Sequence, residues 1–322
     1  MLVLCDHDRG ALADASLEAL TFGRDLAARS GVACEAVLIG SGADAAAAPL
    51  AAYGAEVVHL AAHDVLTDFG PEAWGETLTQ LVASTGASIV TACGTDRGNE
   101  VLAHVAARLD EPFVANCRQV DPSGDAWPVT RVQWGGSLLE DATLTAGCRI
   151  LSLAHHAVEA APAPTPAAGT VVAFSPDLDS ALARTVVTDR VVLTRGITLS
   201  TAPVVVGGGR GVGSAEAFAP LEELAGELGG VVGCSRAVTN NGWRPHSDQV
   251  GQTGTRIAPQ VYIASGISGA IQHWVGAMAS KHILAINTDR EANIVTRADW
   301  AVIGDLHQVI PAITDEIRRR RG

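Results

Sequence analysis

Short apolar runs alternate with longer amphipathic segments over the first 125 residues of the chain. Short apolar runs bounded by turn residues are typical of buried strands, and apolar residues spaced three or four apart are typical of helices. We therefore predict strands at 1–5, 33–39, 56–60, 88–93 and 112–115, and helices at 11–29, 72–85 and 98–109. This alternation predicts a doubly wound, mainly parallel sheet.

The pattern changes after residue 125, where WPVTRVQWGGSLLEDATL (127–144) and GCRILSLAHH (147–156) predict a hairpin or meander with a turn at Gly135 and Gly136. Further on, EAAPAPTPAAGT (159–170) loses all periodicity, and its prolines are expected to stiffen it into an extended linker.

A second alternating array follows a bridging stretch at 171–200. Its predicted strands are 203–206, 230–233, 261–264, 282–286 and 300–303, and its predicted helices are 214–228, 267–279 and 305–319. The chain is thus expected to be an α/β protein with two doubly wound domains, each built on a mainly parallel sheet. We place an N-terminal α/β domain at 1–160, a linker and bridging segment at 161–200, and a Rossmann-like domain at 201–322.

Composition and charge narrow the class of protein. The chain has 322 residues, of which 48% are hydrophobic and 18% are charged, so two ordinary cores are expected and disorder is not. A net charge of −13 argues against nucleic-acid binding, which needs a basic surface. No apolar run approaches the ~20 residues of a membrane span, and the first residues do not resemble a signal peptide. We expect a cytoplasmic protein without membrane insertion.

Cysteine and histidine positions give no sign of a metal site. The six cysteines are scattered without a Cys-x-x-Cys pair, which predicts buried free thiols in a reducing compartment. The ten histidines lack metal-ligand spacing. His155 and His156 are adjacent, so on a strand their rings are expected to face opposite sides and not to bind an ion together. We predict no metal ligands.

A glycine-rich stretch, VVVGGGRGVGSAE (204–216), runs from a predicted strand into a predicted helix. It lacks the complete G-x-G-x-x-G dinucleotide fingerprint because Ser214 takes the place of the third glycine. A tight strand-to-helix turn is the alternative interpretation. Arg210 lies inside this loop, where a guanidinium is well placed to bind a phosphate.

The stretch VYIASGISGAIQHWVGAMAS (261–280) is more informative. The apolar side chains of its predicted helix at 267–279 share one face and are Ile267, Ile271, Val275 and Met278. The first turn would combine unpaired N–H groups, the Ser268 hydroxyl, and glycines at 266 and 269, a combination that suits an anion. We predict a pyrophosphate against these glycines. Close packing of the helix on a neighbouring segment is the alternative.

Two further stretches are expected at the same sheet edge, because the carboxyl ends of parallel strands meet there. GCSRAV (233–238) places Ser235 and Arg236 directly after a predicted strand. DQVGQTGTRIAPQ (248–260) is rich in amides and hydroxyls, and these groups are suited to the polar edge of a ring system. A solvated turn is the alternative for this loop.

Taken in order, these stretches resemble the electron-transfer flavoprotein α-subunit family, which includes FixB-like proteins. YIASGISGAIQHWVGAMASKHILAIN (262–287) is similar to the family signature, and GGGRG, CSRA, QVGQTG and ADWAVIGDLHQVIP are similar to its other flavin-binding stretches. The resemblance is close over 203–312 and looser over 1–160. In the latter range GTDRGNEVLAHVAARL and RVQWGGSLLEDATL are similar to the family's first domain.

The resemblance implies that FAD lies across the carboxyl edge of the second domain. It also implies an adenine-nucleotide-hydrolase-like first domain that binds the partner. The residues implied to bind the cofactor are Arg210, Ser235, Arg236, Gln249, Val250, Gly251, Gln252, Thr253, Gly266, Ser268, Gly269, Ala270, Ile271, Gln272, His273, Asn287, Asp305 and Leu306.

The resemblance places Thr253 near flavin N5, His273 near flavin O2 and Arg236 beside the ring system. A fixed cation about 4 Å from the reduced flavin would stabilise it by on the order of 1–4 kcal/mol. This corresponds to a change in midpoint potential on the order of 100 mV.

The resemblance implies a heterodimer with a β subunit. It also implies an electron carrier rather than an enzyme with catalytic residues. Flavin-linked dehydrogenases would supply the electrons, and an acceptor such as a quinone oxidoreductase would receive them. One alternative is a self-contained flavin- or NAD-dependent oxidoreductase, for which His273 and Asp305 are the acid–base candidates. A cofactor-free interaction subunit is another. The loop GTDRGNE (94–100) is open to two interpretations, a relic nucleotide loop or a structural turn.

Overall fold

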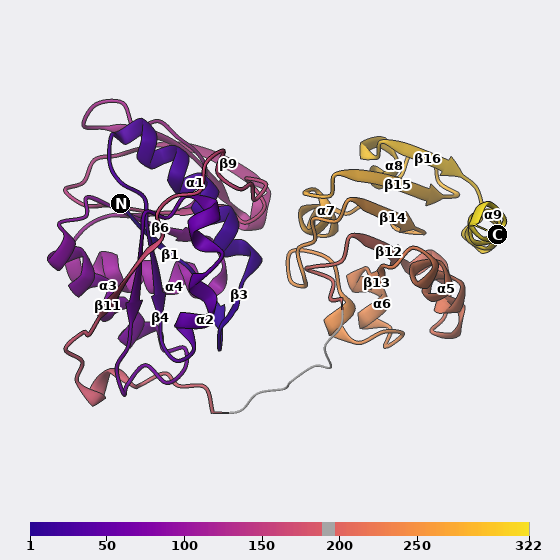
Figure 1. Ribbon diagram of the computed structural model, residues 1–322. Coiled ribbons are helices and arrows are strands. Elements are labelled where there is room, and N and C mark those ends of the chain that lie inside the picture. The colour runs from indigo at the N-terminus through magenta and orange to yellow at the C-terminus, as the bar shows by residue number, and fades with distance from the viewer. Residues whose placement is uncertain (189–196, 322) are drawn as a thin grey trace. The chain divides into compact units, whose positions relative to one another are not determined.

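The computed structural model describes residues 1–188 and 197–321 of the chain (Figure 1). Residues 1–134 and 138–188 form one compact unit, and residues 197–321 form the main part of a second. Each unit is built around its own sheet, and each is described separately below.

The sheet of the first unit has nine strands within the described residues. In spatial order they are β11 (Thr170–Phe174), β5 (Val57–Ala61), β4 (Glu35–Ile39), β1 (Leu2–Leu4), β6 (Ile89–Cys93), β10 (Arg149–Leu153), β7 (Phe113–Val120), β8 (Trp127–Gln133) and β9 (Leu138–Leu144). The strands from β11 to β7 are parallel, and β8 and β9 add an antiparallel hairpin. The hairpin turns in a short 3₁₀ segment at Trp134–Gly136, as the sequence predicts. The stretch 147–156, expected in the same hairpin or meander, instead supplies β10, which pairs in parallel with β6 and β7.

Helices cover both faces of this sheet (Figure 1). They are α1 (Asp14–Ser30), α2 (Ala43–Ala47), α3 (Pro71–Thr85) and α4 (Asp96–Leu109). Val3 packs in the core on the α1 side, whereas its neighbour Leu2 packs in the core that contains α3 and α4. Because both faces of the sheet are buried, the central strands are continuous apolar runs in the sequence. Their positions were therefore predicted correctly. A small two-stranded sheet, β2 (His7–Asp8) with β3 (Ala11–Leu12), follows β1.

Strand β11 comes from the segment at 161–200 that we expected to be a linker and bridge. It pairs in parallel with β5, from Thr170 opposite Val57 to Phe174 opposite Ala61. Before it, the chain runs beside α1, where the backbone N–H of Ala161 donates to the Thr21 hydroxyl at 3.1 Å. The expected linker therefore contributes a strand to the first sheet, which its proline-rich composition did not indicate.

The second unit contains a fully parallel sheet of five strands within the described part of the chain. Their spatial order is β13 (Val231–Cys234), β12 (Val204–Gly208), β14 (Val261–Ser265), β15 (His282–Asn287) and β16 (Trp300–Ile303). The chain passes from β12 to β13 on one side and then to β14 on the other. The order of strands therefore reverses between β12 and β14, and ligands of such sheets bind outside the carboxyl ends of the strands at this point.

The helices of the second unit also cover both faces of the sheet. Helices α5 (Ala219–Glu227), α6 (Arg236–Asn240) and α9 (Leu306–Arg321) pack on one face, and α7 (Ile271–Ala277) and α8 (Asn293–Arg297) pack on the other. Successive strand residues alternate between the two cores, as Val205 and Val206 show. The predicted α/β fold with two doubly wound, mainly parallel sheets is thus confirmed. None of the helices in the described ranges combines the length and apolar character that a membrane span needs.

Candidate functional site

The loops that follow β12 and β14 pack backbone against backbone. The N–H of Gly209 donates to the carbonyl of Ser265 at 2.8 Å, and the N–H of Gly211 donates to the carbonyl of Gly266 at 3.1 Å. A Cβ added at Gly209 would lie 2.6 Å from the carbonyl carbon of Gly266. Real Cβ atoms do not approach so closely, so only glycine fits between these loops.

The helix after β14 begins at Ile271 and not at residue 267. The predicted helix start on Gly266 and Gly269 is wrong, because both adopt the left-handed conformation, with φ of 63° and 74°. A Cβ at Gly269 would overlap the backbone nitrogen of Ile294 in α8 and lie 2.8 Å from its Cα. The alternative of close packing therefore accounts for both glycines. Contact of this loop with a ligand stays a prediction.

The predicted apolar stripe of this helix is also only partly present. Ile267 and Val275 are buried, whereas Ile271 is 50% exposed and Met278 is 39% exposed. Ile267 lies in the loop before the helix, so the spacing that joined it to Ile271 has no helical meaning. His273 occupies the buried face instead.

A cavity of about 480 Å³ opens beside this corner, at the carboxyl end of the second sheet. Half of the predicted site residues line it, and they are Arg210, Ser235, Arg236, Gly266, Ser268, Ala270, Gln272, His273 and Asn287. They come from the segments that follow β12, β13 and β14, including the first residues of α6 and α7, and from the end of β15, so they gather around the reversal of strand order. The structure thus brings residues 77 positions apart in the sequence, Arg210 and Asn287, to one cavity.

The remaining predicted residues do not line this cavity, and they are Gln249, Val250, Gly251, Gln252, Thr253, Gly269, Ile271, Asp305 and Leu306. In the loop at 249–253 the polar groups bond to each other: Gln249 is buried, accepts from the Thr239 hydroxyl at 2.7 Å and donates to the Thr253 hydroxyl at 3.0 Å. Gly251 lies against the backbone of α7. The backbone N–H of the next residue, Gln252, donates to the carbonyl of Gln272 in α7 at 2.7 Å. This loop supports the cavity wall from behind.

Asp305 and Leu306 have local structural partners. The Asp305 carboxylate is exposed and accepts from the N–H of His307 at 3.0 Å, as a residue before a helix commonly does. Leu306 is buried, and a Cβ at Gly266 would lie 2.7 Å from its Cδ2 atom. Leu306 therefore limits the space at the glycine corner, whereas Asp305 caps α9.

Asn287 ties the loop after β14 to the end of β15. Its side-chain amide donates to the carbonyl of Ile267 at 2.8 Å, and its side-chain oxygen accepts from the N–H of Asp289 at 3.0 Å. Asp289 also lines the cavity and was missed by the sequence analysis, as were Asn240 and Ala292. These residues lie in loops and a short helix without any recognisable motif, so only their position after a strand or at a helix end signalled them.

Two cations at the cavity have no acidic partner. Arg210 and Arg236 are both exposed, and neither forms an ion pair with any residue of the described part of the chain. Each follows a strand directly, so both guanidinium groups belong to the carboxyl edge of the sheet. A site with two uncompensated guanidinium groups favours an anionic ligand such as a diphosphate.

His273 is a buried, neutral histidine at the cavity wall. Its Nε2 atom lies 2.7 Å from the hydroxyl of Tyr262, a fully buried residue of β14. Burial lowers the pKa of His273 to about 4 and raises the pKa of Tyr262, so both are uncharged at neutral pH. When the hydroxyl donates to Nε2, the neutral ring carries its hydrogen on Nδ1. That buried Nδ1 atom has no partner at ordinary hydrogen-bond geometry among the described residues, although an interaction with the backbone of Val250 acts to raise the pKa of the ring.

Two cavities of the first unit are less suited to a nucleotide. One of about 590 Å³ lies beside α1, β7 and β8, and its lining combines the carboxylates of Asp25, Asp121 and Asp141 with the guanidinium groups of Arg29 and Arg118, so it offers no excess of positive charge for a diphosphate. The other adjoins the loop at 94–100 and has a volume of only about 10 Å³, about the room that one water needs. There the Thr95 hydroxyl accepts from the N–H of Gly98 at 3.0 Å, and Arg97 pairs with Asp6 at 3.3 Å. The structural interpretation of this loop therefore prevails.

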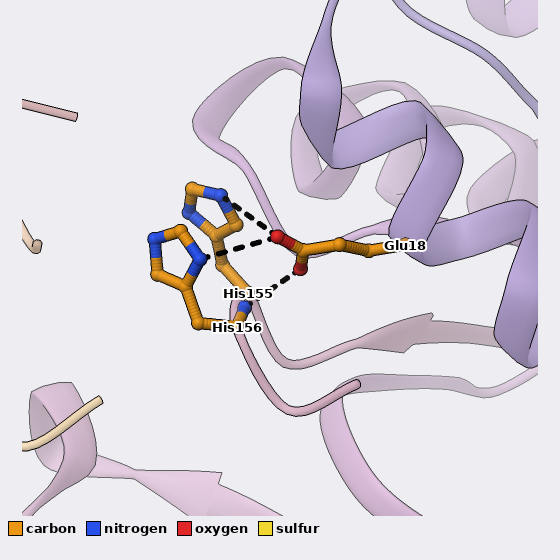
Figure 2. A group of neighbouring side chains, drawn as sticks. All are labelled: Glu18, His155 and His156. Atoms are coloured by element: carbon orange, nitrogen blue, oxygen red, sulfur yellow. Dashed lines mark hydrogen bonds and ion pairs between the residues drawn. The ribbon is translucent and has the colours of Figure 1, made fainter. Parts of the chain in front are cut away.

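Cysteine and histidine side chains gave one confirmed and one wrong prediction. All six cysteines are free thiols, and all but Cys148 are buried. His155 and His156, however, lie in a turn after β10 and not on a strand, and their rings stack with centroids 3.6 Å apart (Figure 2). Both rings face the carboxylate of Glu18, so the expectation that they point to opposite sides is wrong.

Comparison with known proteins adds to this picture. Residues 1–179 match the family model of the electron transfer flavoprotein domain, and residues 198–278 match that of the electron transfer flavoprotein FAD-binding domain.

Full-length relatives carry the same description. The chain is 37% identical over 325 residues to the electron transfer flavoprotein subunit alpha of Mycobacterium leprae, with 100% of this chain and 99% of that protein covered. It is 32% identical over 320 residues to the protein of the same name from Thermoanaerobacterium thermosaccharolyticum, which covers 98% and 97% of the two chains. It is also 36% identical to the protein FixB of Bradyrhizobium diazoefficiens, with 99% of this chain and 88% of that protein covered.

Proposed function

The chain belongs to the electron-transfer flavoprotein α-subunit family, and we propose that it holds FAD in the cavity of its second unit as a carrier of electrons. The observation that carries the proposal is the cavity of about 480 Å³ at the reversal of strand order, with two unpaired arginines at its edge. Volumes of roughly 300–1,000 Å³ are usual for ligand sites. Membership of the family and the match to its FAD-binding domain rest on the comparisons, whereas the assignment of the cavity residues to FAD is our proposal.

The chemistry of the lining residues fits this cofactor. Arg210 offers positive charge for the diphosphate, and the Ser268 hydroxyl and nearby backbone amides offer further donors, whereas Arg236 is the cation that we propose beside the ring system. His273 lines the same cavity, and we propose that its ring contacts the flavin. Because His273 is neutral, it would orient the ring by a hydrogen bond and not by charge.

When bound, FAD supplies the reversible redox chemistry. The polypeptide holds the cofactor, orients its ring system and adjusts its potential with nearby charges and donors. We propose that the protein acts as a heterodimer with a β subunit, which the first domain (1–160) helps to bind. In this role it accepts electrons from flavin-linked dehydrogenases and passes them to an acceptor such as a quinone oxidoreductase. We place it in the cytoplasm.

The surroundings of His273 and Asp305, the two acid–base candidates, argue against a self-contained oxidoreductase. The His273 ring is engaged with Tyr262, and its pKa of about 4 leaves no proton to donate as an imidazolium at neutral pH. Asp305 is exposed, caps α9 and does not line the cavity. Neither side chain is therefore placed for proton transfer to a substrate in this cavity.

The proposal is tested by co-expressing the chain with a β subunit of the same family and measuring the visible spectrum and the ratio of FAD to protein. We expect about one FAD per chain in the second unit. The double change Arg210→Ala and Arg236→Ala should release the cofactor. Arg319→Ala, which removes an exposed arginine on α9 that does not line the cavity, should retain it. A complex that stays colourless with added FAD, or a double variant that binds FAD like the wild type, would contradict the proposal.

A further inference from the structure

Glu18, His155 and His156 bring three potential metal ligands together in the first unit (Figure 2). Glu18 lies on α1, and the two histidines lie in the turn that follows β10. His156 adopts the left-handed conformation, with φ of 63°, and this bend places both rings on the side of the chain that faces α1. One ligand atom from each residue lies within 4.8 Å of the other two.

The carboxylate of Glu18 is held in a fixed orientation. The backbone N–H of His156 donates to Oε2 at 2.8 Å, so Oε1 faces the rings. Oε1 is 3.1 Å from Nδ1 of His156 and 3.9 Å from Nε2 of His155. Two imidazole nitrogens thus converge on one oxygen of a carboxylate that is only 8% exposed.

The three polar groups meet at one point although they come from two separate elements of the fold. Burial of a carboxylate is unfavourable unless it gains polar or charged partners, and here two imidazole nitrogens lie on the same side of it. The two rings are nearly parallel, with an interplanar angle of 23°. A cation at this point would be a common partner for the carboxylate oxygen and both nitrogens.

We propose that Glu18, His155 and His156 form a binding site for a divalent transition-metal ion, with Zn²⁺ as the best match. Two imidazole nitrogens and one carboxylate oxygen are ligands that Zn²⁺ prefers, whereas Ca²⁺ and Mg²⁺ prefer oxygen ligands alone. The ligand atoms are spaced so that small side-chain rotations bring them to the roughly 2.0–2.2 Å of a zinc–ligand bond.

The site would fasten α1 to the segment that connects β10 to β11. The same side of α1 already binds that segment through two further residues. The Thr21 hydroxyl accepts from the N–H of Ala161 at 3.1 Å, and Arg24 donates to the carbonyl of Ala161 at 3.1 Å. The bound ion is therefore a cross-link between a helix and a connecting segment of the first unit. It involves no residue of the proposed FAD site.

Isothermal titration of the metal-free full chain with ZnCl₂ tests the proposal. His155→Gln removes one ligand. His156→Asn removes the other, and asparagine tolerates the left-handed backbone at this position. His246→Gln, which changes an exposed histidine of the second unit, is the matched control. X-ray absorption at the zinc edge then identifies the ligands, because zinc–sulfur bonds of about 2.3 Å differ from zinc–nitrogen and zinc–oxygen bonds of about 2.0–2.2 Å.

We expect one Zn²⁺ per chain in the wild type and in His246→Gln, with nitrogen and oxygen ligands only. His155→Gln and His156→Asn should each bind the ion at least tenfold more weakly while unfolding at nearly the wild-type temperature without zinc. Zinc should raise the unfolding temperature of the first unit only where the site is intact. Three results would each overturn the proposal. They are a wild type that binds no stoichiometric zinc, histidine variants that bind zinc as tightly as the wild type, and sulfur in the coordination shell.

Discussion

Gly269→Ala should destabilise the second unit more than its position in a loop suggests. At this residue φ is 74°, and a non-glycine residue held there costs about 1–2 kcal/mol. The new Cβ would also overlap the backbone nitrogen of Ile294 and lie 2.8 Å from its Cα, so α8 or the loop must move. Overpacking of this kind costs about 1–3 kcal/mol. The sum is a loss of about 2–5 kcal/mol in local stability.

A matched pair of variants separates the two contributions. Gly242 has φ of 70° and no atom within 4 Å of an added Cβ, so Gly242→Ala should show the backbone cost alone, about 1–2 kcal/mol. Gly226 lies in α5 with open space around it, so Gly226→Ala should stabilise its helix by about 0.5–1 kcal/mol.

Hydrogen exchange of the β14 and β15 amides measures the local opening free energy directly. It avoids the assumption that a chain with two units unfolds in one step. FAD retention should fall together with local stability, because Ser268 and Ala270 on either side of the glycine line the cavity. If Gly269→Ala proves no more costly than Gly242→Ala, close approach of α8 is not the reason for this glycine.

Three further predictions concern the cavity wall. The unfolded chain protonates His273 below about pH 6.5 but the folded chain only near pH 4, so the free energy of unfolding should fall by up to about 3 kcal/mol as the pH drops through this range. Urea unfolding of His273→Gln should show a weaker dependence of that free energy on pH, and an unchanged dependence would contradict this. Tyr262→Phe leaves Nε2 of His273 buried without its donor and should cost about 1–3 kcal/mol, measured by exchange in β14, and a neutral result would argue against that hydrogen bond. Arg236→Ala should lower the potential of the bound flavin in a redox titration by about 40 mV, because an exposed cation acts through water and contributes only about 1 kcal/mol; no change would exclude Arg236 as a tuning residue.

Strands of both sheets could be predicted closely because burial on two faces leaves a simple signal. The segment 282–286 was expected as a strand and is found at His282–Asn287. Strand β11 was missed for the opposite reason: it is an exposed edge strand, and its residues follow a proline-rich stretch. The apolar residues of β11 do not by themselves specify pairing with β5, since this pairing depends on the path of the chain along α1.

Periodicity failed where backbone conformation and not side-chain pattern determines the structure. Ile267 is apolar and buried whether or not it is helical, so its spacing from Ile271 imitated a helix. A helix was likewise assumed at Gly266 and Gly269, although glycine is also the residue most tolerant of positive φ. The same error, in the form of a presumed strand, misplaced His155 and His156. In both places residues at positive φ changed the direction of the neighbouring side chains: Gly266 and Gly269 in the first, and His156 in the second.

The glycine corner and the cavity beside it depend on each other. Hydrogen bonds from Gly209 and Gly211 to the loop after β14 fix the position of Gly266 without the use of any side chain. The lining residues on this loop, such as Ser268, therefore occupy positions set by backbone contacts that only glycine permits. Loss of Arg210 removes one charge from an otherwise intact wall, whereas a Cβ at Gly209 would lie 2.7 Å from the Cα of Ile267 and displace the wall itself. Cofactor binding should consequently be more sensitive to the glycines, which touch mainly protein, than to the charged residues proposed to touch FAD.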